Sequence, residues 1–99
     1  MESKIKYSFS AKIWRDNTEN GWYFVTVPSN YSNEIRNNLK WQEEGWGRMK
    51  AIAIIQDLKW ETSIWFDTKG KNYILPIKAL IRKKLLINDG DMLTLSIYV

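Results

Sequence analysis

The sequence of 99 residues predicts a mainly β protein: a small barrel of about six strands with two short helices that cap its ends. Most segments alternate apolar and polar residues, as strands with one buried face do. Two segments instead repeat apolar residues at every fourth position, the spacing of one helix face. Each of these follows a strand that ends in proline, at Pro28 and Pro76. We expect one domain over residues 1–99, with two weakly similar halves at about 5–45 and 48–99.

The first half begins with two expected strands. Residues 5–13 alternate Ile, Tyr, Phe, Ala and Ile with lysine and serine, which predicts a half-buried strand. Residues 16–21 are turn formers, so a hairpin loop follows. Residues 22–27 are aromatic and β-branched on both sides and form the second strand, whose two faces are both partly covered. Pro28 ends it because proline has no N–H for the ladder.

A helix of about two turns follows. Tyr31, Ile35 and Leu39 lie four residues apart and form its packing face. Ser29–Asn30 and Ser32–Asn33 are two possible N-caps, since their side chains can accept from the free N–H groups of the first turn.

The central residues are expected to form a connection and two strands. Residues 40–47 carry two tryptophans and bend at their glycines. Residues 49–55 alternate only weakly, which suits a strand buried on most of both faces. Residues 58–66 alternate again, and Trp60 falls in their apolar phase, so its indole is expected in the core.

The last stretch reads strand, proline, basic helix, turn and strand. Residues 73–75 are a short apolar strand closed by Pro76. Isoleucine or leucine recurs at every fourth position over residues 77–85, which predicts a helix. Residues 88–91 form an Asn-Asp-Gly-Asp turn. Residues 92–99 alternate as the final strand.

A weak internal repeat relates the two halves. Residues 22–39 and 70–85 both run from an aromatic strand through a proline to a helix, and the two prolines lie 48 residues apart. Two related halves closing one barrel-like core would explain this. The alternative is that two short β-to-α connections resemble each other by chance.

Composition restricts the chemistry. The chain has no cysteine and no histidine, so we expect no disulfide, no metal and no cofactor. The net charge of +4 is mildly basic and permits an acidic partner or nucleic acid. No apolar run suits a signal peptide or a membrane span, so a cytoplasmic protein without a membrane partner is expected.

No phosphate loop or nucleophile motif is present. Acid–base catalysis would need a carboxylate pair with one desolvated member, and no pair is marked, so we do not expect an enzyme.

Basic residues and tryptophans are the candidate binding groups. The basic ones surround the second helix, and Arg48 and Lys50 could add to them. They could contact phosphates in a salt-dependent way, or simply form a solvated helix face that complements the helix dipole. The tryptophans outside the apolar phases could form an exposed surface that grips a ligand, or cap the barrel ends. The candidate residues are Lys69, Lys71, Lys78, Arg82, Lys83, Lys84, Trp41, Trp46 and Trp65.

Five segments carry a family resemblance that covers most of the chain. They are Gly21–Pro28, Trp60–Trp65, Leu75–Ala79, Ile81–Lys83 and Gly90–Asp91, and the single residues Phe9, Ala11 and Gly70 match as well. Their order resembles the small bacterial and archaeal domain of unknown function numbered 1905. The resemblance implies a bacterial or archaeal source and a small β-barrel, and it implies no particular activity.

A second resemblance covers residues 73–97 only. This part is similar to the swapped-hairpin DNA-binding domain of bacterial transition-state regulators and antitoxins, through Leu75–Pro76, Ile81–Leu85, Ile87 and Gly90–Asp91. Those domains build a double-split barrel from two chains, which implies that this chain could build one from its two halves. Leu86 stands where they usually place a glycine, so the helix must end without a glycine cap.

The expected function is therefore that of a non-catalytic binding module, whose aromatic and basic surface contacts a ligand or a protein. DNA binding through the basic helix, as in a transcription regulator, is the alternative.

Overall fold

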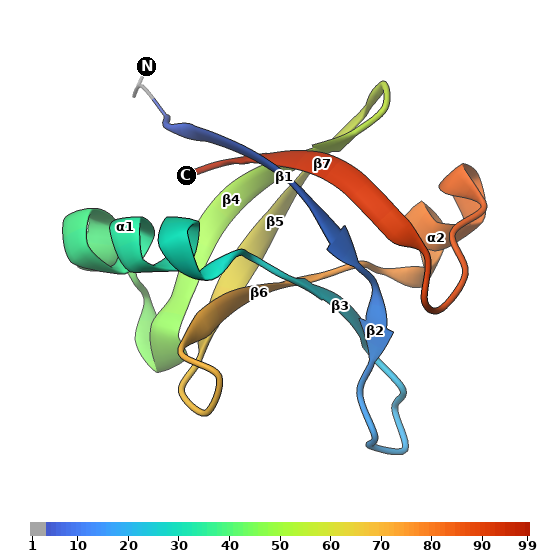
Figure 1. Cartoon of the computed structure of the whole chain (residues 1–99), viewed down its shortest axis with the longest axis horizontal. Helices are drawn as coiled ribbons and strands as arrows, with labels where there is room; N and C mark the ends of the chain where they lie inside the picture. The colour runs from blue at the N-terminus through green and yellow to red at the C-terminus, as the bar shows by residue number, and fades with distance from the viewer. Residues whose placement is uncertain (1–3) are drawn as a thin grey trace.

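The computed structural model describes residues 4–99, which form one curled antiparallel sheet with a helix at either end (Figure 1). The elements in chain order are β1 (Lys6–Lys12), β2 (Trp14–Arg15), β3 (Tyr23–Thr26), α1 (Ser29–Leu39), the 3-10 turns η1 (Lys40–Gln42) and η2 (Gly45–Gly47), β4 (Arg48–Ile55), β5 (Leu58–Asp67), β6 (Asn72–Pro76), α2 (Ala79–Leu85) and β7 (Met92–Tyr98). The mainly β fold with two short helices is confirmed.

The seven strands are ordered β1-β7-β4-β5-β6-β3-β2 and curl into a half-barrel. The sheet has one strand more than the expected six because the first predicted strand divides at Ile13. Its first part, β1, pairs with β7, and its second part, β2, pairs with β3. Both edges of the sheet are thus formed by one bent segment at the N-terminus.

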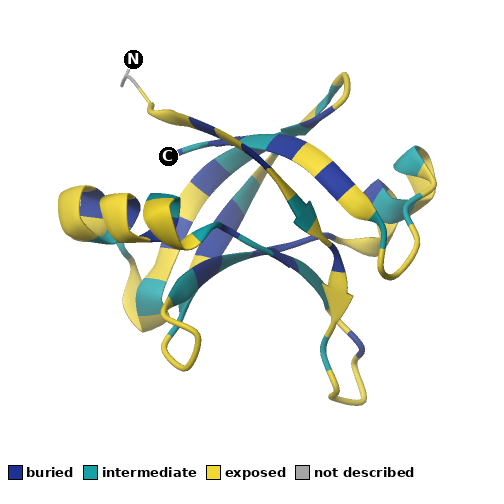
Figure 2. Cartoon of the chain, in the orientation of Figure 1, coloured by how far each residue is buried: buried dark blue, intermediate teal, exposed yellow. Residues whose placement is uncertain are grey.

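The core fills the concave side of the sheet. Buried and exposed residues alternate along β1 and β7, as the sequence predicts (Figure 2). The prediction for β4 is wrong in one respect: Lys50 is exposed and Ile52 and Ile54 are half-buried, so only one face is fully buried. Trp60 is partly buried and packs against the core. The fully buried side chains that fill the centre include Ile13, Val25, Val27, Ile35, Met49, Ile64, Tyr73, Leu75, Ile77 and Ile97.

The helix α1 is longer than expected, with 11 residues, and has no side-chain N-cap. Ser32, a possible cap, lies inside the helix and is fully buried. Its hydroxyl donates to the carbonyl of Val27 and accepts from the N–H of Tyr73, at 3.0 Å each. The serine therefore ties α1 to β3 and β6 instead of capping the helix.

The helix α2 begins two residues later than the fourfold pattern suggests. Ile77 is buried ahead of the helix, and its N–H donates to the carbonyl of Tyr23 at 2.8 Å. Leu86 ends the helix without a glycine, as expected, and adopts the left-handed conformation with φ 55° and ψ 45°. Its N–H reaches the carbonyls of Arg82 and Lys83.

The two strand–proline–helix units meet in the sheet. β3 pairs with β6 in antiparallel register, with Val25 opposite Leu75. Among the described residues, no helix is long and apolar enough to cross a membrane.

Candidate binding cleft

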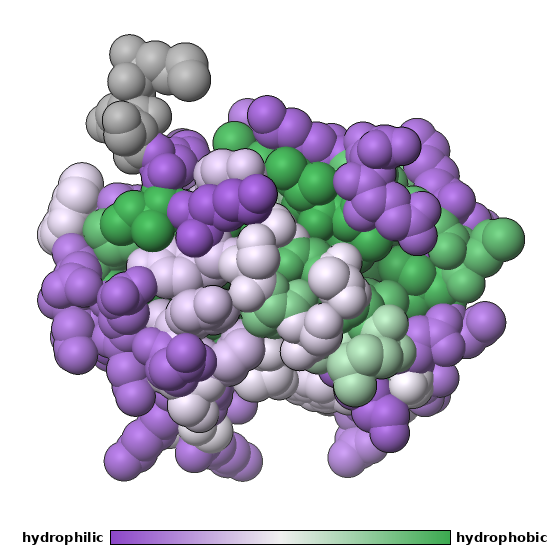
Figure 3. Space-filling model, turned by 45° about the horizontal axis from the view of Figure 1, so that its top comes forward, coloured by the Kyte–Doolittle hydropathy of each residue, from purple (hydrophilic) through white to green (hydrophobic). Residues whose placement is uncertain are grey.

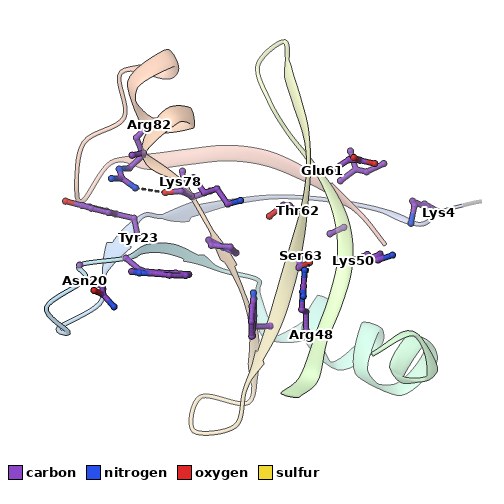
Figure 4. A pocket seen from close by; sticks show the side chains of 18 residues that line it. Lys4, Asn20, Tyr23, Arg48, Lys50, Glu61, Thr62, Ser63, Lys78 and Arg82 are labelled. Carbon is purple, nitrogen blue, oxygen red and sulfur yellow. Dashed lines mark hydrogen bonds between the residues drawn. The ribbon is translucent and has the colours of Figure 1, made fainter. Parts of the chain in front are cut away.

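The sheet splits between β5 and β6. The two strands pair only where Trp65–Asp67 meets Asn72–Ile74. Beyond this ladder β5 continues along β4 to Leu58, whereas β6 turns away to pair with β3. A cleft of about 930 Å³ lies at this divergence (Figure 4). We call it the β5–β6 cleft; its walls come from β4 and β5 on one side and from β3, the end of β6 and α2 on the other.

The lining of the β5–β6 cleft is strongly basic. It contains five basic residues, which are Lys4, Arg48, Lys50, Lys78 and Arg82. Glu61 is the only acidic residue in the lining. Basic groups around a concave surface reinforce one another's potential, so the potential in the cleft is positive.

Both arginines of the cleft are held by neighbouring groups. The Arg82 guanidinium lies 4.0 Å from the centre of the Tyr23 ring and donates to the carbonyl of Ile77 at 2.6 Å. Arg48 donates from Nε to the hydroxyl of Ser63 at 3.1 Å. These contacts restrict the two side chains, and each guanidinium keeps further N–H donors for a ligand.

Aromatic residues contribute apolar surface to the same cleft. Trp22 is 53% exposed and Trp65 is 37% exposed, and both line it together with Tyr23. The ring of Trp22 stacks on that of Phe24, with 6.3 Å between the ring centres. The ring centres of Phe24 and Trp14 are 5.0 Å apart. A row of three aromatic rings, from Trp14 on β2 through Phe24 on β3 to Trp22 just before β3, therefore leads to the rim of the cleft.

Three of the nine sequence-predicted site residues meet in the cleft: Lys78, Arg82 and Trp65. Lys83 lines a second, smaller hollow of about 390 Å³ beside Leu86 and Ile87, which shares Arg82 with the cleft. The other five, which line neither hollow, are Lys69, Lys71, Lys84, Trp41 and Trp46.

Trp41 and Trp46 are 77% and 93% exposed, so they do not cover an end of the barrel. Trp46 also has a φ of 67°, which is uncommon for a residue other than glycine. Apolar surface also gathers at the end of the molecule that carries α2 (Figure 3), where Leu80, Leu86 and Met92 are exposed.

Sequence reasoning missed Trp22, Tyr23, Lys4, Glu61 and Ser63 as cleft residues. The sequence pattern indicates Trp22 and Tyr23 only as strand residues, and the contact of Tyr23 with Arg82 of α2 depends on the β3–β6 pairing. Arg48 and Lys50, which the sequence marked as possible additions, do line the cleft.

A polar network lies outside the cleft and has a structural role. The Glu43 carboxylate accepts hydrogen bonds from Arg36 and from the hydroxyl of Tyr73, each at 2.5 Å through Oε1. Arg36 also lies over the Phe66 ring, 4.0 Å from its centre. Burial, together with the Glu43 carboxylate, raises the pKa of Tyr73 above its usual range. The network fastens the connection before β4 to β6.

Residues 4–99 contain no group of three or more acidic side chains that could hold a metal ion. The described lining of the cleft offers charged groups, hydrogen-bonding groups and aromatic surface.

Comparisons with known proteins show the family of the chain. No curated protein matches the sequence. The model of the domain of unknown function DUF1905 matches residues 9–97, nearly the whole chain, and the protein therefore belongs to this family.

Proposed function

We propose that the protein is a non-catalytic binding module that holds an anionic ligand in the β5–β6 cleft. The observation that carries the proposal is the lining: five basic residues and one acidic residue surround about 930 Å³. Trp22 and Trp65 add partly exposed aromatic surface, which contributes affinity through burial of a ligand's apolar parts. Pockets of this size, partly apolar and with a few convergent polar groups, are typical ligand sites.

Binding is favoured over catalysis by the groups available in the lining. The Ser63 hydroxyl accepts a hydrogen bond from Arg48, a cation that cannot act as its general base. Glu61 is exposed and has no second acidic residue beside it in the lining. A nucleophile with an adjacent base, or a carboxylate pair, would support an enzyme.

The alternative of DNA binding through the basic helix receives less support from the geometry. Lys78 and Arg82 line the cleft, whereas Lys83 and Lys84 lie outside it. Arg82 is also engaged by Tyr23 and Ile77. Only two of the four basic residues of this region therefore line the cleft, and Arg82 is partly engaged within the protein, which leaves fewer free charges for phosphate contacts.

A pair of double variants tests the proposal. Lys50→Ala with Lys78→Ala removes two cleft charges, and Lys83→Ala with Lys84→Ala removes two charges outside it. Neither pair makes a side-chain hydrogen bond or salt bridge within residues 4–99. The two double variants are thus matched in net charge and should both fold.

The probes are citrate, an acidic peptide of eight residues and a short DNA duplex, titrated by tryptophan fluorescence at about 50 and about 300 mM KCl. We expect the cleft variant to bind citrate or the peptide about tenfold more weakly, with the control within about twofold of the parent. DNA binding that is lost only in the control variant would establish the alternative. No binding of any probe by the parent would refute the proposal.

A further inference from the structure

We infer that the anionic ligand of the cleft is an extended acidic peptide segment of a partner protein, which adds to the free edge of β5 as a further strand. This inference rests on the proposed function and specifies the ligand of the same site. The inference is based on the free backbone N–H and C=O groups of β5, whereas the proposed function is based on the side chains that line the cleft.

The register of the β4–β5 hairpin determines where the backbone groups of β5 point. The two strands are joined by a two-residue connection, so Ile55 and Leu58 form the hydrogen-bonded pair that closes it. Hydrogen-bonded and non-bonded pairs then alternate along an antiparallel ladder. Lys59, Glu61 and Ser63 therefore direct their N–H and C=O groups away from β4.

The groups of these three residues point toward the side where β6 would lie in an unbroken sheet. β6 reaches β5 only from Trp65 onward. Among the backbone hydrogen bonds of residues 4–99, none involves Lys59, Glu61 or Ser63 on this side. Unpaired edge groups of this kind are a template for another strand. Glu61 and Ser63 also line the cleft, so the free edge is one of its walls.

The dimensions suit a short peptide. From Lys59 to Ser63 the strand advances about 14 Å, since each residue of an antiparallel strand adds about 3.4 Å. An added strand would therefore pair over about five residues. A small anion would neutralise the basic side chains but leave this row of donors and acceptors unpaired. An acidic peptide can neutralise the basic side chains with its carboxylates and pair its backbone with the free N–H and C=O groups of β5. Addition of a peptide strand to a sheet edge is an established mode of peptide recognition.

The charge of the cleft sets the composition of the peptide. Lys78 extends from the other wall toward the free edge, Arg82 lines that wall beside Tyr23, and Arg48 and Lys50 extend from β4 (Figure 4). Side chains of an extended peptide alternate between its two faces. The matching sequence thus has Glu or Asp at every second position, on the face that meets the basic residues.

The first test uses peptide probes that differ only in backbone N–H groups. The parent is an acetylated and amidated peptide of eight residues, alternating glutamate and threonine. One derivative is N-methylated at every glutamate and the other at every threonine. In a strand, alternate N–H groups point to opposite sides, so only one set can pair with β5. We expect one derivative to bind at least about tenfold more weakly and the other within about threefold of the parent, by fluorescence titration.

The second test uses variants of Glu61. Glu61→Pro removes the N–H that points into the cleft and leaves the hydrogen bonds to β4 in place, because Glu61 makes none of them. Glu61→Ala is the matched control, since it removes the same carboxylate and keeps the N–H. We expect about tenfold weaker peptide binding by Glu61→Pro than by Glu61→Ala. Circular dichroism verifies that both variants fold. If Glu61→Pro does not fold, the test of strand addition is the binding of the two methylated peptides to the parent protein.

The outcomes separate the inference from the proposed function. If both methylated peptides bind as tightly as the parent, while Lys50→Ala with Lys78→Ala weakens all three, charge alone holds the peptide and strand addition is overturned. If citrate binds in the cleft and the parent peptide does not, the peptide ligand is overturned and anion binding stands. If no probe binds, both fail.

Discussion

The Arg82 guanidinium stacks on the Tyr23 ring, with 4.0 Å between its carbon and the ring centre. The two residues come from α2 and β3, and the same guanidinium donates to the carbonyl of Ile77. Arg82 thus joins the helix to the strand pair β3–β6 while it lines the cleft. Arg82 therefore contributes both to the stability of this wall and to the positive charge of the cleft.

Arg82→Lys tests this connection. Lysine keeps the charge but loses the planar stack and the fixed donor geometry. We expect the free energy of unfolding to fall by about 1 kcal/mol in urea denaturation. Tyr23→Leu removes the other half of the stack and should cost a similar amount. The double variant should lose less than the sum of the single losses, because the partners share one interaction; additive losses would contradict the coupling.

The Glu43 network predicts a larger effect outside the cleft. Glu43→Ala leaves the buried Tyr73 hydroxyl and Arg36 without their common acceptor. We expect a loss of about 2 kcal/mol in the free energy of unfolding. Glu43→Gln keeps an acceptor oxygen and should lose less. Citrate affinity should be unchanged in both variants, and a change there would connect the network to the cleft.

Leu86 is predicted to be a site of stabilisation. It is 83% exposed and holds a φ of 55°, a conformation that is costly for a residue with a Cβ. Leu86→Gly should raise the free energy of unfolding by up to about 1 kcal/mol, the relief of strain exceeding the added flexibility of the unfolded chain. Leu86→Ala keeps the strain and removes the exposed apolar surface. If Leu86→Ala raises the free energy of unfolding as much as Leu86→Gly does, the exposed leucine side chain, and not the backbone conformation, is the cause of the lower stability.

Tyr7 predicts a loss of stability at high pH. Burial, with a contribution from Glu34, raises the pKa of Tyr7 to about 12. In the unfolded state Tyr7 loses this proton near pH 10, about two pH units earlier than in the folded state. The contribution of Tyr7 to the free energy of unfolding is therefore complete below pH 10 and is lost as the pH rises toward 12. The hydroxyl of Tyr7 has no hydrogen-bond partner within the described residues.

Tyr7→Phe should therefore be neutral or stabilising at pH 7, by up to about 1 kcal/mol, and should reduce the loss between about pH 10 and 12. Tyr73 keeps part of the alkaline dependence, because its pKa is raised too. Thermal unfolding of both proteins across this range measures the difference. An unchanged alkaline slope in Tyr7→Phe would contradict the role of Tyr7.

The tryptophans should separate into two groups by ligand binding. Trp65→Ala is expected to weaken binding of the alternating glutamate–threonine peptide severalfold, because Trp65 lines the cleft. Trp41→Ala with Trp46→Ala should leave that affinity unchanged. Isothermal titration calorimetry measures both without relying on tryptophan emission. A loss of affinity in the second variant would extend the binding surface to the connection before β4.

The sequence determined the elements and the faces that they bury. The alternation in β1 and β7, the two prolines and the fourfold spacings depend on local backbone periodicity, which a sequence expresses directly. It also marked Lys78, Arg82 and Trp65 as binding candidates. The length of α1, the role of Ser32 and the single buried face of β4 were not predictable in this way, because each depends on neighbours brought from elsewhere in the chain.

The tertiary structure alone decided where the sheet splits and which residues surround the cleft. β5 reads as one uninterrupted strand, and nothing in its alternation indicates that β6 pairs with only its last three residues. The contact of Arg82 with Tyr23 likewise requires the pairing of β3 with β6. Strand pairing joins residues distant in the chain, and its register depends on how all the strands pack together, so it is a property of the assembled sheet and not of any one segment.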